Sequence, residues 1–172
     1  MLLQQLSTDR LDLRPFSKSG LALMRLLDTD EEVVRFLGHG RVKTPEESEA
    51  SLLKILNDYE NFGLGLLSAF DKQTNQFLGR CGLIPWTLDG TLTWEIGYSF
   101  IRSAWGKGYA TEAASNLTNW AQVNLVVPYV VSLIHPLNRS SIHVAEKVGM
   151  IRWKEVSGSG SCLVAYRKEF AY

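Results

Sequence analysis

The stretch from Trp94 to Thr111 constrains the fold of this chain more than any other. Its first half alternates like a β-strand, and its second half passes through a short basic turn into the start of a helix. Gly106 and Gly108 let the backbone approach a ligand closely, and the unpaired N–H groups at the helix start favour an anion. Lys107 adds a positive charge between the two glycines. The stretch therefore predicts an anion-binding turn between a strand and a helix.

Two common phosphate-binding motifs do not fit this turn. A nucleotide P-loop needs Ser or Thr after its lysine, whereas Gly108 follows Lys107. A dinucleotide-binding turn needs a further glycine where Thr111 stands and an acidic residue about 20 positions later, and residues 113–145 contain no Asp or Glu. A tight turn that uses glycine for its geometry alone remains the structural alternative.

The apolar period switches repeatedly along the chain, which predicts one mixed α/β domain over residues 1–172, with helices on both sides of the sheet. The first expected strand is an edge strand, and the next three form an antiparallel meander. The expected strands are Arg10–Phe16, Leu64–Phe70, Gln76–Ile84, Thr91–Phe100, Val126–Ile134, Ile151–Val156 and Cys162–Lys168. The expected helices are Lys18–Leu27, Asp30–Leu37, Thr44 to about Tyr59, Tyr109 to near Asn124, and Asn138–Val148.

The composition argues against several classes of protein, among them proteins that bind nucleic acid or a membrane. Eighteen basic and eighteen acidic residues give no formal net charge, so we expect neither nucleic acid nor a membrane surface as a partner. No apolar run reaches the ~18 residues of a membrane span and no signal sequence is visible, so a cytoplasmic protein is expected. Cys81 and Cys162 lack the spacing of a metal site or a disulfide framework, and we expect both to be buried thiols. His39, His135 and His143 are too scattered for a metal cluster.

The charge is balanced only over the whole chain. Residues 1–100 hold ten basic and fourteen acidic side chains, whereas residues 101–154 hold six basic and two acidic ones. Such segregation predicts an anion site in the second half of the chain, and chance variation of surface charge is the alternative.

The turn also resembles a known signature. The sequence WGKGYA at 105–110 is similar to the acetyl-coenzyme A motif of the GNAT N-acetyltransferases, which runs Arg or Gln, any, any, Gly, any, Gly or Ala. Trp105 departs from it by replacing Arg or Gln. The segments LDLRPF, GRCGL, WEIGY, WGKGYATEAA and HPLNRSSIHVAEKVGM together resemble the subgroup that includes the ribosomal-protein N-terminal acetyltransferases of the RimJ and RimL kind, over nearly the whole chain.

This resemblance implies a single-domain GNAT fold whose mixed, mostly antiparallel sheet splays between the fourth and fifth strands. Acetyl-CoA would lie in that gap, with its pantetheine amides on the strand backbone and its pyrophosphate on the turn. No metal is implied. The residues expected to bind the cofactor are Tyr98, Ser99, Phe100, Trp105, Gly106, Lys107, Gly108, Tyr109, Ala110, Thr111, Asn138 and Ser141.

The last predicted helix carries a candidate catalytic residue. Helical spacing places Asn138, Ser141 and Ala145 on one face. Many family members carry a tyrosine at the position of Ala145 that protonates the departing thiolate, and this chain has no hydroxyl there. The resemblance therefore makes Ser141 the nearest group able to donate to the sulfur. Simple helix-start roles for Asn138 and Ser141 are the alternative.

Glu95 is the candidate general base. It alternates with bulky neighbours and shares a strand face with Gly97 and Ser99. A carboxylate on a central strand is costly unless it is paired or functional, so a structural pairing is the alternative. His135, Tyr98 or a chain of waters could also take up the proton.

These residues together predict an enzyme that moves an acetyl group from acetyl-CoA directly to a primary amine. The acceptor could be a protein N-terminus or a small amine, with contacts expected from Phe36–Arg41 and from the Pro85–Gly90 loop. A non-catalytic acyl-CoA-binding or sensing module is the alternative, because Ala145 removes one expected acid. A homodimer is possible for a chain of this size.

Overall fold

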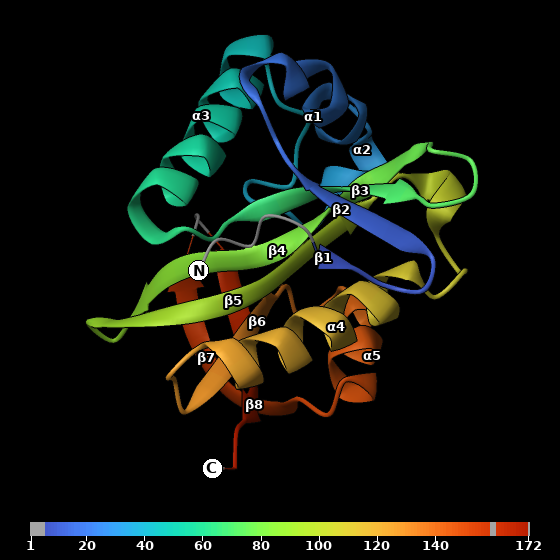
Figure 1. Ribbon diagram of the computed structural model, residues 1–172. Helices are drawn as coiled ribbons and strands as arrows, with labels where there is room; N and C mark the ends of the chain where they lie inside the picture. Colours follow the sequence, from blue (N-terminus) through green and yellow to red (C-terminus); the bar gives the residue numbers. More distant parts are fainter. Residues whose placement is uncertain (1–5, 159–160, 172) are drawn as a thin grey trace.

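The computed structural model describes residues 6–158 and 161–171, in which eight strands form a single sheet in the order β1-β2-β3-β4-β5-β6-β8-β7 (Figure 1). Only β5 and β6 run parallel, so the predicted mixed, mostly antiparallel sheet is confirmed. The strands are β1 (Leu6–Ser7), β2 (Leu11–Pro15), β3 (Leu66–Asp71), β4 (Phe77–Leu88), β5 (Thr91–Phe100), β6 (Tyr129–Ile134), β7 (Ile151–Gly158) and β8 (Ser161–Glu169).

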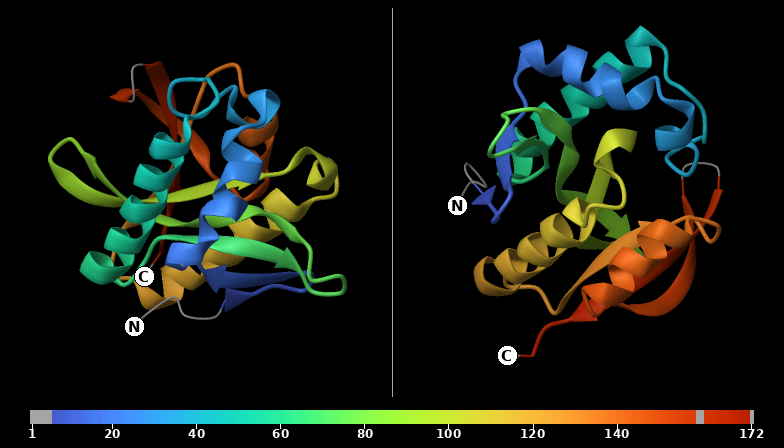
Figure 2. Two further views of the ribbon diagram at one scale, coloured as in Figure 1. Left: turned by 90° about the horizontal axis from the view of Figure 1, so that it is seen from above. Right: turned by 90° about the vertical axis from the view of Figure 1, so that its right-hand side faces the viewer.

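Helices cover both faces of the sheet, as predicted. Helices α1 and α3 lie on one face of β3, β4 and β5, and α4 lies on the other face with α5 beside it (Figures 1 and 2). The helices are α1 (Leu21–Asp28), α2 (Glu31–Val34), α3 (Pro45–Phe62), α4 (Tyr109–Asn124) and α5 (Arg139–Lys147), with short 3-10 turns at Lys18–Gly20 and Arg102–Ala104.

The sheet opens between β5 and β6, where the splay was expected. Their ladder has one pair of Cα partners, Glu95 with Val131, next to a hydrogen bond of 2.9 Å from the Ser132 hydroxyl to the Ile96 carbonyl. Beyond these contacts the strands diverge toward Phe100. Backbone groups of β5 past the opening therefore have no partner strand on that side, which leaves them available to a ligand.

Local sequence signals explain the ends of the longest helix. The Thr44 hydroxyl accepts a hydrogen bond from the Glu47 N–H, and the Glu47 carboxylate accepts one from the Thr44 N–H. Pro45 stands at the first helical position, and Gly63 closes the helix with φ of 69°. The capping box and the glycine cap fix α3 at both ends.

The prediction that the Arg10–Phe16 segment is an edge strand is wrong. The preceding chain folds back as β1, and Leu6 pairs antiparallel with Leu13 of β2. The helix expected at Asp30–Leu37 is also shorter, since α2 ends at Val34 and Gly38 takes a φ of 53° that a helix does not allow.

Other boundaries shift by a few residues. Strand β4 runs on to Leu88, because a two-residue turn with positive φ at Asp89 and Gly90 holds the hairpin in register to its tip. Strand β6 starts only at Tyr129, and the expected stretch before it includes the fully exposed Val126. Strand β7 extends to Gly158, two residues beyond its expected end at Val156, and residues 159–160 lie outside the described chain.

The two cysteines differ in environment. Cys81 is fully buried in β4, and burial raises the pKa of its thiol to about 12, which leaves it inert at neutral pH. Cys162 is exposed on β8, so the expectation of a buried thiol there is wrong. Its strand lies near the end of the sheet, where the side chain can face solvent.

Candidate active site

The glycine turn before α4 has the backbone that an anion site requires. Gly108 caps the helix with φ of 82° and no side-chain hydrogen bond, and Gly106 has φ of 72°. The first helical hydrogen bond runs from the Glu112 N–H to the Gly108 carbonyl, so the N–H groups of residues 109–111 are not used by the helix. A Cβ on Gly106 would meet no atom within 4 Å, so there the positive φ, and not crowding, favours glycine.

Arg10 holds this turn in place, and sequence reasoning missed it. Its guanidinium donates to the Lys107 carbonyl at 2.8 Å and to the Glu112 carboxylate at 2.6 Å, and it lies 4.4 Å from the centre of the Tyr109 ring. Nothing local in the sequence marks Arg10, because its partners are about a hundred residues away. The guanidinium also brings positive charge to the turn.

A cavity of about 420 Å³, here called the cofactor groove, extends from this turn into the opening of the sheet. It is lined by eleven of the twelve residues expected to bind the cofactor, all except Lys107. The Ser99 hydroxyl is buried with no hydrogen-bond partner among the described residues. The Trp105 indole is half-exposed and donates to the Phe100 carbonyl at 2.7 Å, which fixes the loop.

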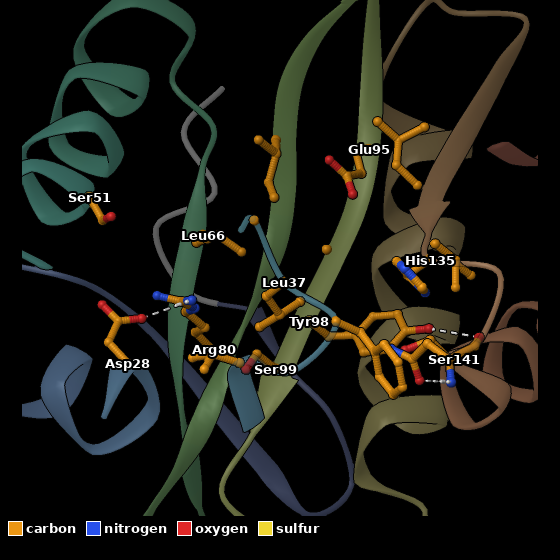
Figure 3. A pocket seen from close by; sticks show the side chains of 18 of the residues that line it. Asp28, Leu37, Ser51, Leu66, Arg80, Glu95, Tyr98, Ser99, His135 and Ser141 are labelled. Carbon is orange, nitrogen blue, oxygen red and sulfur yellow. Dashed lines mark hydrogen bonds and ion pairs between the residues drawn. The ribbon is translucent and has the colours of Figure 1, made fainter. Parts of the chain in front are cut away.

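Helix α5 forms the second wall of the groove. The Asn138 side-chain oxygen accepts from the Ser141 N–H at 3.2 Å, so the helix-capping role is present. The Ser141 carbonyl accepts from the Tyr98 hydroxyl at 3.1 Å, which ties α5 to β5 across the opening (Figure 3). Within the described chain, the Asn138 amide nitrogen makes no hydrogen bond and remains free for a ligand, whereas the side chains of Ser141 and Tyr98 lie within hydrogen-bonding reach of each other. Ala145 is buried and lines neither cavity.

A second cavity of about 440 Å³, here called the acceptor cavity, lies between β5 and the segment from α1 to α3 (Figure 3). Glu95, Gly97 and Ser99 line it from one face of β5, as their spacing predicted. It joins the cofactor groove, because six residues line both: Phe36, Leu37, Tyr98, Ser99, Asn138 and Ser141. Two substrates could therefore meet along β5.

Glu95 has the environment of a base that works near neutral pH. Burial among protein atoms raises the pKa of its carboxyl from 4.5 to about 7, against the opposing effects of a hydrogen bond from the Leu133 backbone and the charge of Lys54. Burial also raises the pKa of Tyr98, to about 12, so its phenol stays protonated and suits donation better than proton uptake.

Of the two segments predicted to contact the acceptor, one lines the acceptor cavity and the other does not. Residues 36–39 and Arg41 line the acceptor cavity, and the Phe36 ring lies 5.2 Å from the His135 ring. The His135 Nδ1 accepts from the Leu137 N–H, so only Nε2 faces other partners. Residues 85–90 are not part of the lining and instead extend the β4–β5 hairpin beyond Ile84.

The structure adds a charged cluster that the sequence did not reveal. Asp28 of α1, Lys43 before α3 and Arg80 of β4 meet at the wall of the acceptor cavity. These residues come from three separate elements, so no spacing rule connects them.

The described residues contain no group of three or more His, Cys, Asp or Glu side chains placed to hold a metal ion. No helix in the described part of the chain is long and apolar enough to cross a membrane.

Comparisons with known proteins agree with this geometry. The family description "Acetyltransferase (GNAT) domain" matches residues 10–151. The chain is 32% identical over 166 residues to the uncharacterized protein YkkB of Bacillus subtilis, covering 96% of this chain and 95% of the relative. It is 28% identical to the crystal structure of an acetyltransferase from Agrobacterium tumefaciens, with a TM-score of 0.81 and coverage of 98% and 96% of the two chains.

The fold extends to more distant enzymes. A ribosomal-protein-S5-alanine acetyltransferase from Vibrio fischeri is 16% identical, with a TM-score of 0.75 and coverage of 96% of each chain, which shows a shared fold. Because the matched domain spans most of the chain and the groove has the expected lining, the chain belongs to the GNAT acetyltransferase family and is an acetyl-CoA-dependent acetyltransferase.

Proposed function

We propose that this enzyme transfers the acetyl group directly to a primary amine that enters the acceptor cavity. The observation that carries the proposal is the junction of the two cavities at Tyr98, Ser99 and Ser141, with Glu95 on the same strand. An amine on the acceptor side and a thioester reaching in from the groove would meet along β5, between this junction and Glu95, without a covalent enzyme intermediate. The buried Cys81 is therefore not needed as a nucleophile.

The groove suits acetyl-CoA in three respects. The turn from Gly106 to Thr111 offers free N–H groups and the positive end of a helix dipole to a pyrophosphate. The diverging edge of β5 offers backbone groups to the amides of the pantetheine arm. The buried hydroxyl of Ser99 and the free amide nitrogen of Asn138 supply further polar contacts. Acetyl-CoA, when bound, supplies the activated acetyl group.

We assign the proton transfers to Glu95 and Ser141. The neutral amine nitrogen forms a bond to the acetyl carbon, the carbon–sulfur bond breaks, and the nitrogen loses a proton to the Glu95 carboxylate. The departing thiolate takes a proton from the hydroxyl of Ser141, a residue that lines both cavities. Solvent then restores the serine proton.

A non-catalytic acyl-CoA-binding module is the second candidate, favoured by one observation. The position that often carries a tyrosine in this family holds Ala145, which is 2% exposed and lies outside both cavities. Such a module would bind acetyl-CoA without turnover.

Two measurements separate these functions. Thermal unfolding with acetyl-CoA at a hundred times its Kd should stabilise the protein by about 2.7 kcal/mol, with no shift from NAD or ATP. Thiol release is then followed with a panel of primary amines and N-terminal peptides. Stabilisation with thiol release supports the enzyme, stabilisation without it supports the module, and absence of both contradicts the proposed groove.

A further inference from the structure

The charged cluster at the far wall of the acceptor cavity is incompletely paired. The Asp28 carboxylate is fully buried, and neither of its oxygens has a hydrogen-bond partner in the described chain. Its ion-pair distances to Lys43 Nζ and to an Arg80 guanidinium nitrogen are both 3.4 Å, which is long for charge-assisted hydrogen bonds. Figure 3 shows Asp28 facing Arg80. Arg80 otherwise donates to the weak sulfur acceptor of Met24 at 3.3 Å.

The part of this cluster that a ligand can reach is cationic. The side chain of Asp28 is 0% exposed, whereas that of Arg80 is 10% and that of Lys43 is 30% exposed. Two positive charges face one negative charge, and the neighbouring Arg41 is already held by both oxygens of Glu47 at 2.6 and 2.9 Å. The cavity therefore presents one uncompensated positive charge at this end.

Burial disfavours both cations in the absence of a counter-ion. Desolvation lowers the pKa of Arg80, and desolvation together with the charge of Arg80 lowers the pKa of Lys43. An anion bound between them would reverse these effects, because it would supply a second negative charge and stronger acceptors than the Ser51 hydroxyl, which Lys43 reaches at 2.8 Å, and the Met24 sulfur.

The sheet register fixes where this end lies relative to Glu95. Arg80 is the Cα partner of Ser99, and Ile84 is the partner of Glu95, so both pairs share one face of the sheet. Glu95 precedes Ser99 by four residues, which corresponds to about 13 Å along an extended strand. A molecule lying along β5 could place one end at Glu95 and the other at Arg80.

We infer that the acetyl acceptor is a bifunctional molecule, with its primary amine near Glu95 and an anionic group, carboxylate or phosphate, bound by Arg80 and Lys43. The inference rests on the proposed function and names the substrate class for the same site. Asp28 is a positioning residue, because it touches the two cations and not the ligand. The anionic group holds the amine at a fixed position along β5, beside Glu95.

Matched acceptors test the inference directly. Straight-chain ω-amino acids of increasing length are compared with their ω-amino amides, which keep the amine and lose the negative charge. Tripeptide amides with Asp or Asn at the third position form a second arm, which distinguishes a peptide source of the anion from a small molecule. We expect the charged member of one arm to have at least about tenfold higher kcat/KM than its neutral match.

Two variants and one control test which residues cause the preference for the charged acceptor. Lys43→Gln should remove most of the preference for the charged acceptor, measured as the ratio of kcat/KM for the ω-amino acid to kcat/KM for its amide. Arg80→Met leaves the buried Asp28 with Lys43 as its one remaining cation and could prevent folding, so it is made together with Asp28→Asn. Arg152→Gln removes an exposed charge paired with Glu155 on β7, and it should keep the full preference.

Binding to the protein saturated with CoA, measured by calorimetry, provides a readout that needs no turnover. Tighter binding of the ω-amino acid than of its amide, lost in Lys43→Gln, supports the inference even where no acetylation is seen. Equal binding and equal turnover of charged and neutral acceptors would overturn it. Failure of acetyl-CoA itself to bind would instead contradict the proposed function, so the two failures are distinguishable.

Discussion

Glu95 lines the acceptor cavity, and it is also buried deeply enough among protein atoms for its pKa to be raised. It lies in the only stretch where β5 and β6 pair, and it lines the acceptor cavity while protein atoms raise its pKa to about 7. A carboxylate with such a pKa can both accept and release a proton near neutral pH. The same burial makes its ionisation unfavourable for folding.

The pH dependence of activity follows from this pKa. For the unaltered enzyme, kcat/KM should rise as the pH increases through about 7, because only the deprotonated Glu95 accepts a proton. The Glu95→Gln variant should lose that rise, and the pH dependence of its kcat/KM should then reflect only the ionisation of the acceptor amine. The measurement is the pH–rate profile with one amine, and an unchanged profile would return Glu95 to a structural role.

The pH dependence of stability has the opposite sign. The pKa of Glu95 is raised from 4.5 on folding, so the native protein binds the proton more tightly than the unfolded chain, and stability is lost as the pH rises from about 4.5 to about 7. Glu95→Gln removes this loss. Urea titrations should show the variant as the more stable protein at pH 8, with the difference shrinking toward pH 4, and a less stable variant at pH 8 would contradict burial as the cause.

Replacing Ser141 tests whether its hydroxyl is the acid that protonates the departing thiolate. Its backbone N–H and carbonyl bind Asn138 and Tyr98, and Ser141→Ala leaves both bonds in place. The substitution should lower kcat about tenfold or more with little change in the Kd for acetyl-CoA. Tyr98→Phe is the comparison, because it breaks the tie to α5 while keeping the serine hydroxyl. Unchanged kcat in Ser141→Ala would remove this residue from the mechanism.

At the scale of elements, the first strands and the cofactor turn depend on each other. Arg10 carries this dependence, because it reaches the turn from just before β2 through Lys107, Tyr109 and Glu112. The N-terminal segment thus stabilises a loop that follows it by about a hundred residues. The helix start at α4 supplies the N–H groups, and Arg10 holds them in position.

Arg10→Gln should therefore weaken acetyl-CoA binding about tenfold with little effect on kcat at saturating cofactor. Arg14→Gln is the matched control, because Arg14 follows Arg10 by four residues, within β2, and pairs with Asp12 and Asn75, away from the groove. Isothermal titration of both variants checks the prediction. Equal affinities would show that the turn holds its shape without Arg10.

The whole molecule consists of two parts of the sheet joined by few bonds. The strands from β1 to β5 meet the strands from β6 to β8 through one ladder pair, the bond from the Ser132 hydroxyl to the Ile96 carbonyl, and the hydrogen bond from the Leu133 backbone to the Glu95 carboxyl. The Tyr98–Ser141 contact adds a tie from β5 to α5. A ligand in the opening would touch both parts and reinforce this junction.

Ser132→Ala should lower the free energy of unfolding by about 1 kcal/mol and weaken acetyl-CoA binding, because it loosens the junction. Ser68→Ala loses a similar buried bond to the Arg14 carbonyl within one part of the sheet. It should lower stability by a similar amount and leave acetyl-CoA affinity unchanged. Chemical denaturation and titration measure both quantities, and equal effects of the two variants on affinity would contradict a role for the junction.

Much of this molecule follows from short-range sequence signals. The capping box at Thr44, the glycines at 106 and 108 and the alternation along 91–100 each depend on neighbouring residues, so the helix, the turn and the strand could be predicted. The alternation of side chains along a strand is also a local signal, and it placed Glu95 and Ser99 on one strand face.

Only the tertiary structure decided which distant residues meet. The support from Arg10 and the cluster of Asp28, Lys43 and Arg80 both join segments far apart in the chain. Their contacts depend on how helices pack on the sheet, and no period or spacing encodes that arrangement. The raised pKa of Glu95 belongs to the same class, because desolvation depends on every element that surrounds the carboxyl and not on its neighbours in sequence.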